Sequence, residues 1–310
     1  MAPPILVLGY GSLMSAKGLG PQAPAVLDMW PARLAAWRTF DKPADTGFIA
    51  MDLVAPRRAT LHARRATSAD TREVDQTLEV AAGTTTTPAL RPDSGRAIGA
   101  ALVLFDAAGT TALAKREDYC TGNWDRLVAA AGERGLGAFL LDLARTNADD
   151  PLGYRRALAE VAGPAELDCF HYLPHPVETD GDPAVAFIAP EPGRTGDPRV
   201  DSVKLRWPSS YPVRLHELHR AGTRILEGGY DAERQHGYVE KCCLAMAHGI
   251  DVSDLFAGPL CPNDRSSSLL AGWRSDPTAW REEQAALRAV VRTVASVEAY
   301  RKRFPAAPAV

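Results

Sequence analysis

The strongest constraint on the fold comes from short apolar runs bounded by turn residues. Residues 5–8 are all aliphatic and lead into a tyrosine flanked by two glycines, and 97–105 form a longer, largely apolar run that closes on Asp106. Runs of this length between turn residues are typical of buried β-strands. A further strand is predicted over 48–54. The first part of the chain is therefore expected to build a sheet.

Helical signals dominate the rest of the chain, with two short strands among them. The last segment, Asp276–Phe304, has the clearest signals, because Asp276 can cap a helix, Pro277 suits its first position, and the aliphatic residues share one stripe. Strands followed by helices predict an α+β fold, with a sheet partly covered by helices and an added C-terminal helix. The predicted strands are 170–173 and 184–188, and the predicted helices are 138–144, 154–161, 212–227 and 235–248.

Composition and charge favour a cytoplasmic globular protein that binds neither nucleic acid nor membrane. The chain has 310 residues, 46% of them hydrophobic, enough to bury a core without disulfides or metals. Its net charge of −3 offers no basic field to a polyanion. No apolar run approaches the roughly 20 residues of a membrane span, and the N-terminus lacks the basic region of a secretory signal. Five cysteines without paired spacing suit a reducing cytoplasm.

The polar segment 55–96 interrupts the pattern of strands. It is rich in threonine and arginine and predicts a long surface insertion with one strand of its own, near 77–80. We expect one domain over 1–260 that carries this insertion, and a helical extension over 261–310 that packs on it. The aliphatic stripe of the extension offers a surface for a homodimer.

The glycine-flanked turn Gly9–Leu13 admits several interpretations. A dinucleotide-binding fingerprint needs a third glycine where Met14 stands and a long helix directly after it, and the sequence has neither. A phosphate-binding P-loop needs a Gly-Lys-Ser/Thr sequence, which the chain lacks. Two interpretations remain open: a tight turn in the core, or a nest of successive backbone N–H groups that holds a small anion such as a carboxylate.

The remaining motifs predict no metal site and no serine nucleophile. His216 and His219 stand one residue too close for a zinc-binding HExxH helix, and the adjacent Cys242 and Cys243 would chelate a metal poorly. Ser12 is not in a G-x-S-x-G elbow and has no persuasive histidine or aspartate partner. A serine hydrolase is therefore unsupported.

Two motifs, in this order, resemble those of the γ-glutamylcyclotransferase family. The sequence Tyr-Gly-Ser-Leu follows the first strand at 10–13, and the strand at 97–105 is followed by a short helix with Arg116-Glu117 and then Tyr119. Further on, 236–256 is similar to the helical segment of the ChaC-type branch. The resemblance covers residues 4–255 with gaps, and it implies a mixed β-sheet or barrel partly covered by helices.

The resemblance also implies a cofactor-free lyase. In a γ-glutamyl amide the substrate's own α-amine attacks the γ-carbonyl, which closes the ring of 5-oxoproline and releases an amine. Glu117 would carry the proton from the α-ammonium to the departing nitrogen, helped by a pKa that partial burial raises. Backbone amides of the turn would hold the substrate's oxygens. From residue type and position, two tyrosines are expected to add hydroxyl donors and one arginine to pair with a carboxylate of the substrate. The residues implied for substrate binding are Tyr10, Gly11, Ser12, Leu13, Arg38, Tyr119 and Tyr172.

The identity of the substrate stays open at this point. Glutathione is the reference substrate of the ChaC-type branch, and the longer chain leaves room for a specialised γ-glutamylated metabolite. Asp118 stands before Tyr119 where that branch usually has glycine. Two alternatives remain: hydrolysis or acyl transfer on the same fold, and a non-catalytic member that binds a metabolite or a protein. A Glu117 side chain that shares a pocket with the amides of the turn would favour the enzyme.

Overall fold

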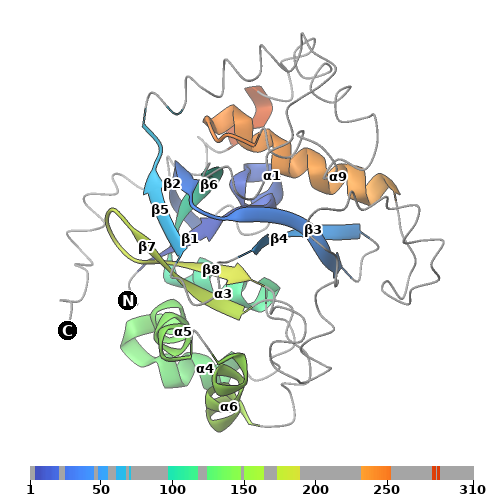
Figure 1. Ribbon diagram of the computed structural model, residues 1–310. Coiled ribbons are helices and arrows are strands. Elements are labelled where there is room, and N and C mark those ends of the chain that lie inside the picture. The colour runs from blue at the N-terminus through green and yellow to red at the C-terminus, as the bar shows by residue number, and fades with distance from the viewer. Residues whose placement is uncertain are drawn as a thin grey trace.

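The computed structural model describes residues 4–20, 25–44, 48–54, 61–67, 70, 97–117, 124–147, 150–163, 173–188, 232–252, 281–283 and 285–286. Within them, six strands close into a mixed barrel at the centre of Figure 1, in the order β1-β6-β2-β5-β7-β8. β6 is antiparallel to both β1 and β2, and the barrel closes where β8 pairs in parallel with β1. The strands are β1 (Ile5–Gly9), β2 (Val26–Leu34), β5 (Leu61–Arg65), β6 (Ile98–Phe105), β7 (Leu173–Thr179) and β8 (Ala184–Ile188).

At β6 both faces of the barrel wall are apolar. In β6, Leu102 and Leu104 belong to the cluster inside the barrel, whereas Val103 and Phe105 belong to the cluster that faces the helices. Every residue of β6 is buried. A strand covered on both faces shows a continuous apolar run without alternation. The strands predicted at 5–8, 97–105 and 184–188 are confirmed as β1, β6 and β8.

A second, two-stranded sheet lies beside the barrel and consists of β3 (Trp37–Ala44) and β4 (Phe48–Val54). The strand predicted at 48–54 is confirmed, but it pairs outside the barrel. The strand predicted at 170–173 is wrong in its end, since β7 runs from Leu173 to Thr179. Residues 170–172 lie outside the described part of the chain.

Helices cover the barrel from two sides, which gives the predicted α+β arrangement (Figure 1). α5 lies against β7 on one side, while α9 lies against β4 on the other. The helices predicted at 138–144, 154–161 and 235–248 are confirmed in α5, α6, and α9 with η5. The helices are η1 (Ser12–Met14), α1 (Ala16–Leu19), α3 (Ala107–Glu117), α4 (Trp124–Ala131), η3 (Gly132–Arg134), α5 (Gly135–Thr146), α6 (Pro151–Ala162), α9 (Ala232–Cys243) and η5 (Leu244–His248), where η marks a 3-10 helix.

Two predicted helices lie wholly or largely outside the described residues. The helix at 212–227 is one of them. Of Asp276–Phe304, residues 281–283 and 285–286 are described, and they are helical. The division into a domain and a C-terminal extension therefore stays a prediction. Among the described helices, none has the length and apolarity that a membrane span requires.

The surface insertion expected over 55–96 is wrong for residues 61–65, because these residues form strand β5 of the barrel wall. Leu61 and Ala63 are buried inside the barrel, while His62 and Arg64 point outward. The alternation is that of a half-buried strand. Its outward half resembles a polar loop in composition, which explains the error. Residues 71–96 lie outside the described part.

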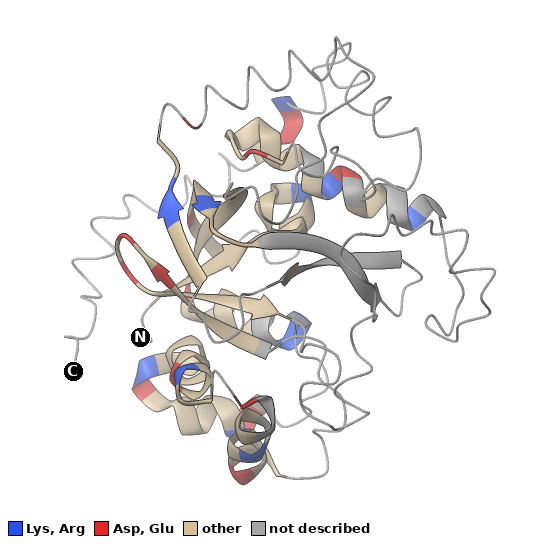
Figure 2. Ribbon diagram, in the orientation of Figure 1, with Lys and Arg blue, Asp and Glu red and all other residues tan. Residues whose placement is uncertain are grey.

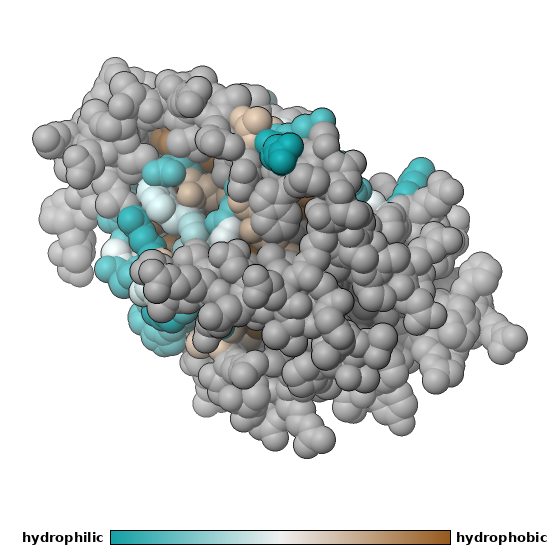
Figure 3. Space-filling view, turned by 90° about the horizontal axis from the view of Figure 1, so that it is seen from above, coloured by the Kyte–Doolittle hydropathy of each residue, from teal (hydrophilic) through white to brown (hydrophobic). Residues whose placement is uncertain are grey.

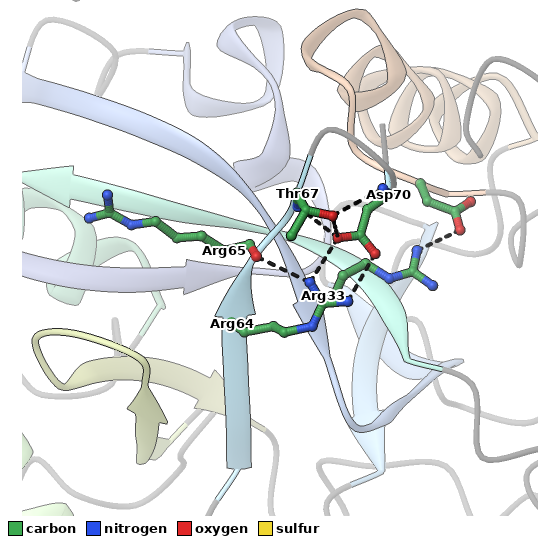
Figure 4. Close-up of polar contacts among 6 residues, drawn as sticks. Arg33, Arg64, Arg65, Thr67 and Asp70 are labelled. Carbon is green, nitrogen blue, oxygen red and sulfur yellow. Dashed lines mark hydrogen bonds and ion pairs between the residues drawn. The ribbon is translucent and has the colours of Figure 1, made fainter. Parts of the chain in front are cut away.

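Beyond β5 the chain is held to the barrel by a cluster of polar contacts (Figure 4). Arg64 Nη1 and Nη2 donate to the two carboxylate oxygens of Asp70 at 2.7 and 2.9 Å. The N–H and hydroxyl of Thr67 donate to Asp70 Oδ2 at 2.6 and 2.8 Å. Arg33 lies opposite Arg64 on β2 and pairs with Asp251 at 2.7 Å. Arg33 thus has a carboxylate from a distant segment, whereas that of Arg64 comes from six positions further along the chain.

We expect Asp70→Asn to lower the free energy of unfolding by about 1 kcal/mol at neutral pH, a modest value because the Arg64 side chain is half exposed. Hydrogen bonds from Arg64, and then from Thr67, hold the pKa of Asp70 well below its ordinary range, although burial opposes them. A depressed pKa stabilises the fold above the ordinary value of about 4 and loses this contribution below it. In urea titrations the difference from wild type should shrink as the pH falls below about 4. Glu133→Gln, at an exposed position of η3, is the control. A difference that stays constant down to pH 3 would contradict this account.

Candidate active site

The turn after β1 forms one side of the candidate site. η1 begins directly after Gly11, and the N–H groups of Met14 and Ser15 donate to the carbonyls of Gly11 and Ser12 at 3.2 and 3.4 Å. The first N–H groups of any helix lack partners within the helix. In the described part of the chain, the N–H groups of Gly11, Ser12 and Leu13 donate no hydrogen bond. Three successive donors are therefore available where β1 leaves the barrel.

The side chains of the turn fix it to both hydrophobic clusters. Leu13 and Met14 are buried in the outer cluster. Tyr10 is buried in the cluster inside the barrel, and its hydroxyl donates to the carbonyl of Phe187 on β8. Gly9 is needed here because a Cβ at this position would lie 2.9 Å from Leu13 Cβ. Tyr10 thus joins the end of β1 to β8.

Arg116 connects this turn to the end of α3. Its Nη2 donates to Ser12 Oγ at 3.1 Å, and its Nη1 donates to the carbonyl of Gly18 at 3.2 Å. The guanidinium therefore lies beside the available N–H groups and adds a positive charge to them. Glu117 is the next residue and the last of α3. The two motifs that the sequence analysis paired thus meet in space at Arg116, and the side chain of Glu117 lies outside the described part.

The other predicted substrate-binding residues are not tested by the structure. Arg38 lies on β3 opposite Leu53 of β4, and its side chain is outside the described part. Tyr119 and Tyr172 are also outside the described residues. The site that can be described therefore consists of the turn, Arg116 and the backbone at the end of α3.

A buried acid that the sequence analysis missed lies behind the turn. Glu283, with 3% of its side chain exposed, accepts hydrogen bonds from the N–H of Ala16 and, at 3.1 Å, from that of Lys17. His248 Nε2 lies 2.8 Å from Glu283 Oε1. In sequence, Glu283 is one acid among several in a helical segment, so no local signal distinguishes it. The described residues contain no group of three side chains suited to a metal ion.

The described surface mixes polar and apolar residues (Figure 3). On the face seen in Figure 3, described hydrophilic residues lie beside hydrophobic ones that are set deeper. Basic and acidic residues are interspersed over the described helices (Figure 2). No protein-family model, curated protein or solved structure matches the chain. A functional assignment therefore depends on the geometry of the site and on the sequence motifs.

We expect Arg116→Met to lower the free energy of unfolding by about 1–3 kcal/mol, because it removes two hydrogen bonds from a charged donor and leaves Ser12 Oγ and Gly18 O without it. Lys115→Met is the matched control, since Lys115 is the exposed neighbour on the same helix. That change should stay within about 0.5 kcal/mol. Urea denaturation followed by circular dichroism measures both. Equal effects of the two substitutions would show that the link between α3 and the turn contributes nothing.

Proposed function

We propose that the chain is a cofactor-free γ-glutamylcyclotransferase-like lyase, which converts a γ-glutamyl amine or peptide into 5-oxoproline and a free amine. The observation that carries the proposal is the pair of hydrogen bonds from Arg116 to Ser12 and Gly18. They join the end of α3, where Glu117 stands, to the turn with available N–H groups. The mixed barrel with helices on two sides agrees with the γ-glutamylcyclotransferase-type fold that the motifs imply.

The reaction needs few chemical groups from the protein. The α-amine attacks the γ-carbonyl carbon, the new C–N bond closes a five-membered ring, and the bond to the departing nitrogen breaks. The substrate is its own nucleophile, so holding its folded conformer supplies much of the acceleration. One proton must leave the α-ammonium to free the nucleophile, and a second must pass from the attacking nitrogen to the departing nitrogen as the ring forms and the amide bond breaks. A single carboxylate at Glu117 performs both transfers as general base and then general acid.

The turn and Arg116 supply the electrostatic part of the mechanism. Negative charge develops on the γ-carbonyl oxygen during attack, and the substrate also carries an α-carboxylate. Preformed N–H donors lower the energy of such a charge without reorganising during the reaction. The N–H groups of Gly11–Leu13 serve one of these oxygens, and the charge of Arg116 strengthens their field. We expect this chemistry to take place in the cytoplasm.

A panel of γ-glutamyl compounds tests the proposal. Glutathione, γ-glutamyl dipeptides and γ-glutamyl alkylamines are incubated with the protein, and the products are separated by mass spectrometry. Release of 5-oxoproline from at least one of them supports cyclisation. Free glutamate would instead indicate hydrolysis, and a γ-glutamyl hydroxamate formed with added hydroxylamine would indicate acyl transfer. Binding without any product would indicate a metabolite-binding protein, and each of these three results would overturn the proposal.

A further inference from the structure

The segment from the turn to α1 is folded so tightly that its two ends lie in direct backbone contact. A Cβ at Gly18 would lie 1.7 Å from the carbonyl oxygen of Ser12, so the two backbones are in direct contact. Arg116 donates to both of these residues. The hydroxyl of Ser15 accepts from the N–H of Gly18 at 3.0 Å. A displacement of α1 is therefore transmitted to Ser12 and to the N–H groups of the turn.

Residues from the second half of the chain also hold this segment. The carboxylate of Glu283 accepts from the N–H groups of Ala16 and Lys17, which lie 267 and 266 positions away in the sequence. Ser15 Oγ donates to the carbonyl of Lys241 at 2.6 Å. Both contacts connect the segment to the region of α9 and η5, because Lys241 belongs to α9 and Glu283 also contacts His248 of η5.

The burial of Glu283 makes its contacts interdependent. A carboxylate with 3% of its side chain exposed has lost its hydration, and it is tolerated only where donors replace the lost water. Among the described residues, its donors are two N–H groups of α1, with His248 beside it. The same contacts also occupy two N–H groups that would otherwise compete for an anionic substrate. The N–H groups of Gly11–Leu13 are then the donors that remain to bind the substrate.

We propose that Glu283 is a positioning residue of the active site: it holds α1 so that the turn presents the N–H groups of Gly11–Leu13 to the substrate. The C-terminal segment that carries Glu283 then contributes to the geometry of the site. The effect on substrate rests on the proposed function, whereas the effect on the conformation of residues 10–19 does not.

Glu283→Ala removes the equivalent of one acetate ion from this position. Added acetate should therefore restore the hydrogen bonds to the N–H groups of Ala16 and Lys17. Hydrogen exchange of residues 10–19, measured by mass spectrometry, should accelerate in Glu283→Ala at a temperature where the barrel strands keep their protection. Acetate should restore the protection, and sodium chloride at the same ionic strength should not. The KM for the γ-glutamyl substrate should rise by about tenfold or more, with a smaller change in kcat, and acetate should reverse this rise.

Two further variants keep the test decisive. Glu283→Gln retains an oxygen acceptor and should show an intermediate acceleration, which decides the matter if Glu283→Ala fails to fold. Glu240→Gln alters the partly exposed partner of the Lys17 side chain, at 3.0 Å, and should leave exchange and KM unchanged. Exchange at 10–19 that is unchanged in both Glu283 variants, or accelerated equally over the whole barrel, would overturn the proposal. A wild-type protein without γ-glutamyl activity would overturn the proposed function alone, because the exchange measurement needs no turnover.

Discussion

Replacing Glu117 with glutamine is expected to lower the rate of 5-oxoproline release by about 10²–10⁴-fold, the range that a positioned general acid–base contributes. Glutamine has nearly the shape of glutamate but cannot accept a proton from the α-ammonium. Binding of the substrate depends on the turn and Arg116, so KM should change little. Release of 5-oxoproline from the best substrate of the panel, followed by mass spectrometry, measures both constants.

The control for this experiment is Glu160→Gln, at an exposed position of α6. It makes the same chemical change away from the site and should retain full activity. Circular dichroism and the midpoint of urea unfolding establish that both variants are folded. Wild-type turnover in a folded Glu117→Gln protein would remove Glu117 from the mechanism.

Gly18→Ala is expected to have the largest effect on stability, about 3 kcal/mol or more, at the upper end of what overpacking costs. The added methyl group would lie 1.7 Å from Ser12 O and 2.6 Å from Ser12 C. Both are backbone atoms, so no flexible side chain can move away and α1 must separate from the turn. The free energy of unfolding in urea measures the loss. A protein that still folds should also lose 5-oxoproline release, because Ser12 belongs to the turn.

Gly237→Ala is the matched control for the glycine prediction. Gly237 is also helical, in α9, but no atom lies within 4 Å of the position its Cβ would take. Alanine in an open helical position should raise the free energy of unfolding by about 0.5–1 kcal/mol. We therefore expect the free energy of unfolding to fall in Gly18→Ala and to rise in Gly237→Ala. A loss below about 1 kcal/mol for Gly18→Ala would contradict the close contact between α1 and the turn.

Local patterns of apolar residues were sufficient to predict a strand or a helix when the residues of that element alone indicate that it is buried. β1, β6 and β8 are continuous apolar runs because the interior cluster covers one face and the helices cover the other. The helical periodicity at 138–144 and 154–161 identified α5 and α6 for the same reason. In each case a short window of sequence contains the whole signal.

Long-range pairing was beyond such patterns. β5 resembles part of a polar insertion in its sequence, since only Leu61 and Ala63 face inward. β2 contains a proline, Pro31, and an irregularity between Val26 and Asp28, so its apolar pattern is broken. The parallel pairing of β8 with β1 that closes the barrel joins strands far apart in the sequence. No local rule specifies such a partner.

The site could be predicted in part for the same physical reasons. The turn and the end of α3 carry recognisable motifs. Because β1 and β6 are antiparallel, the segments after the two strands leave at opposite ends of the pair, and it is the far end of α3, at Arg116, that reaches the turn. Glu283 was missed because its importance arises from contacts with Ala16, Lys17 and His248, all distant in sequence. One acid among several in a helical segment has no pattern that distinguishes it from a solvated one.

Product analysis in water labelled with oxygen-18 tests most directly whether the ring closes within the substrate. Attack by the α-amine incorporates no solvent oxygen, whereas hydrolysis places one solvent oxygen in the new carboxylate. We expect 5-oxoproline without the label, together with an equal amount of the released amine. Glutamate carrying oxygen-18, with no 5-oxoproline, would contradict the assignment of this chain as a γ-glutamylcyclotransferase-like enzyme.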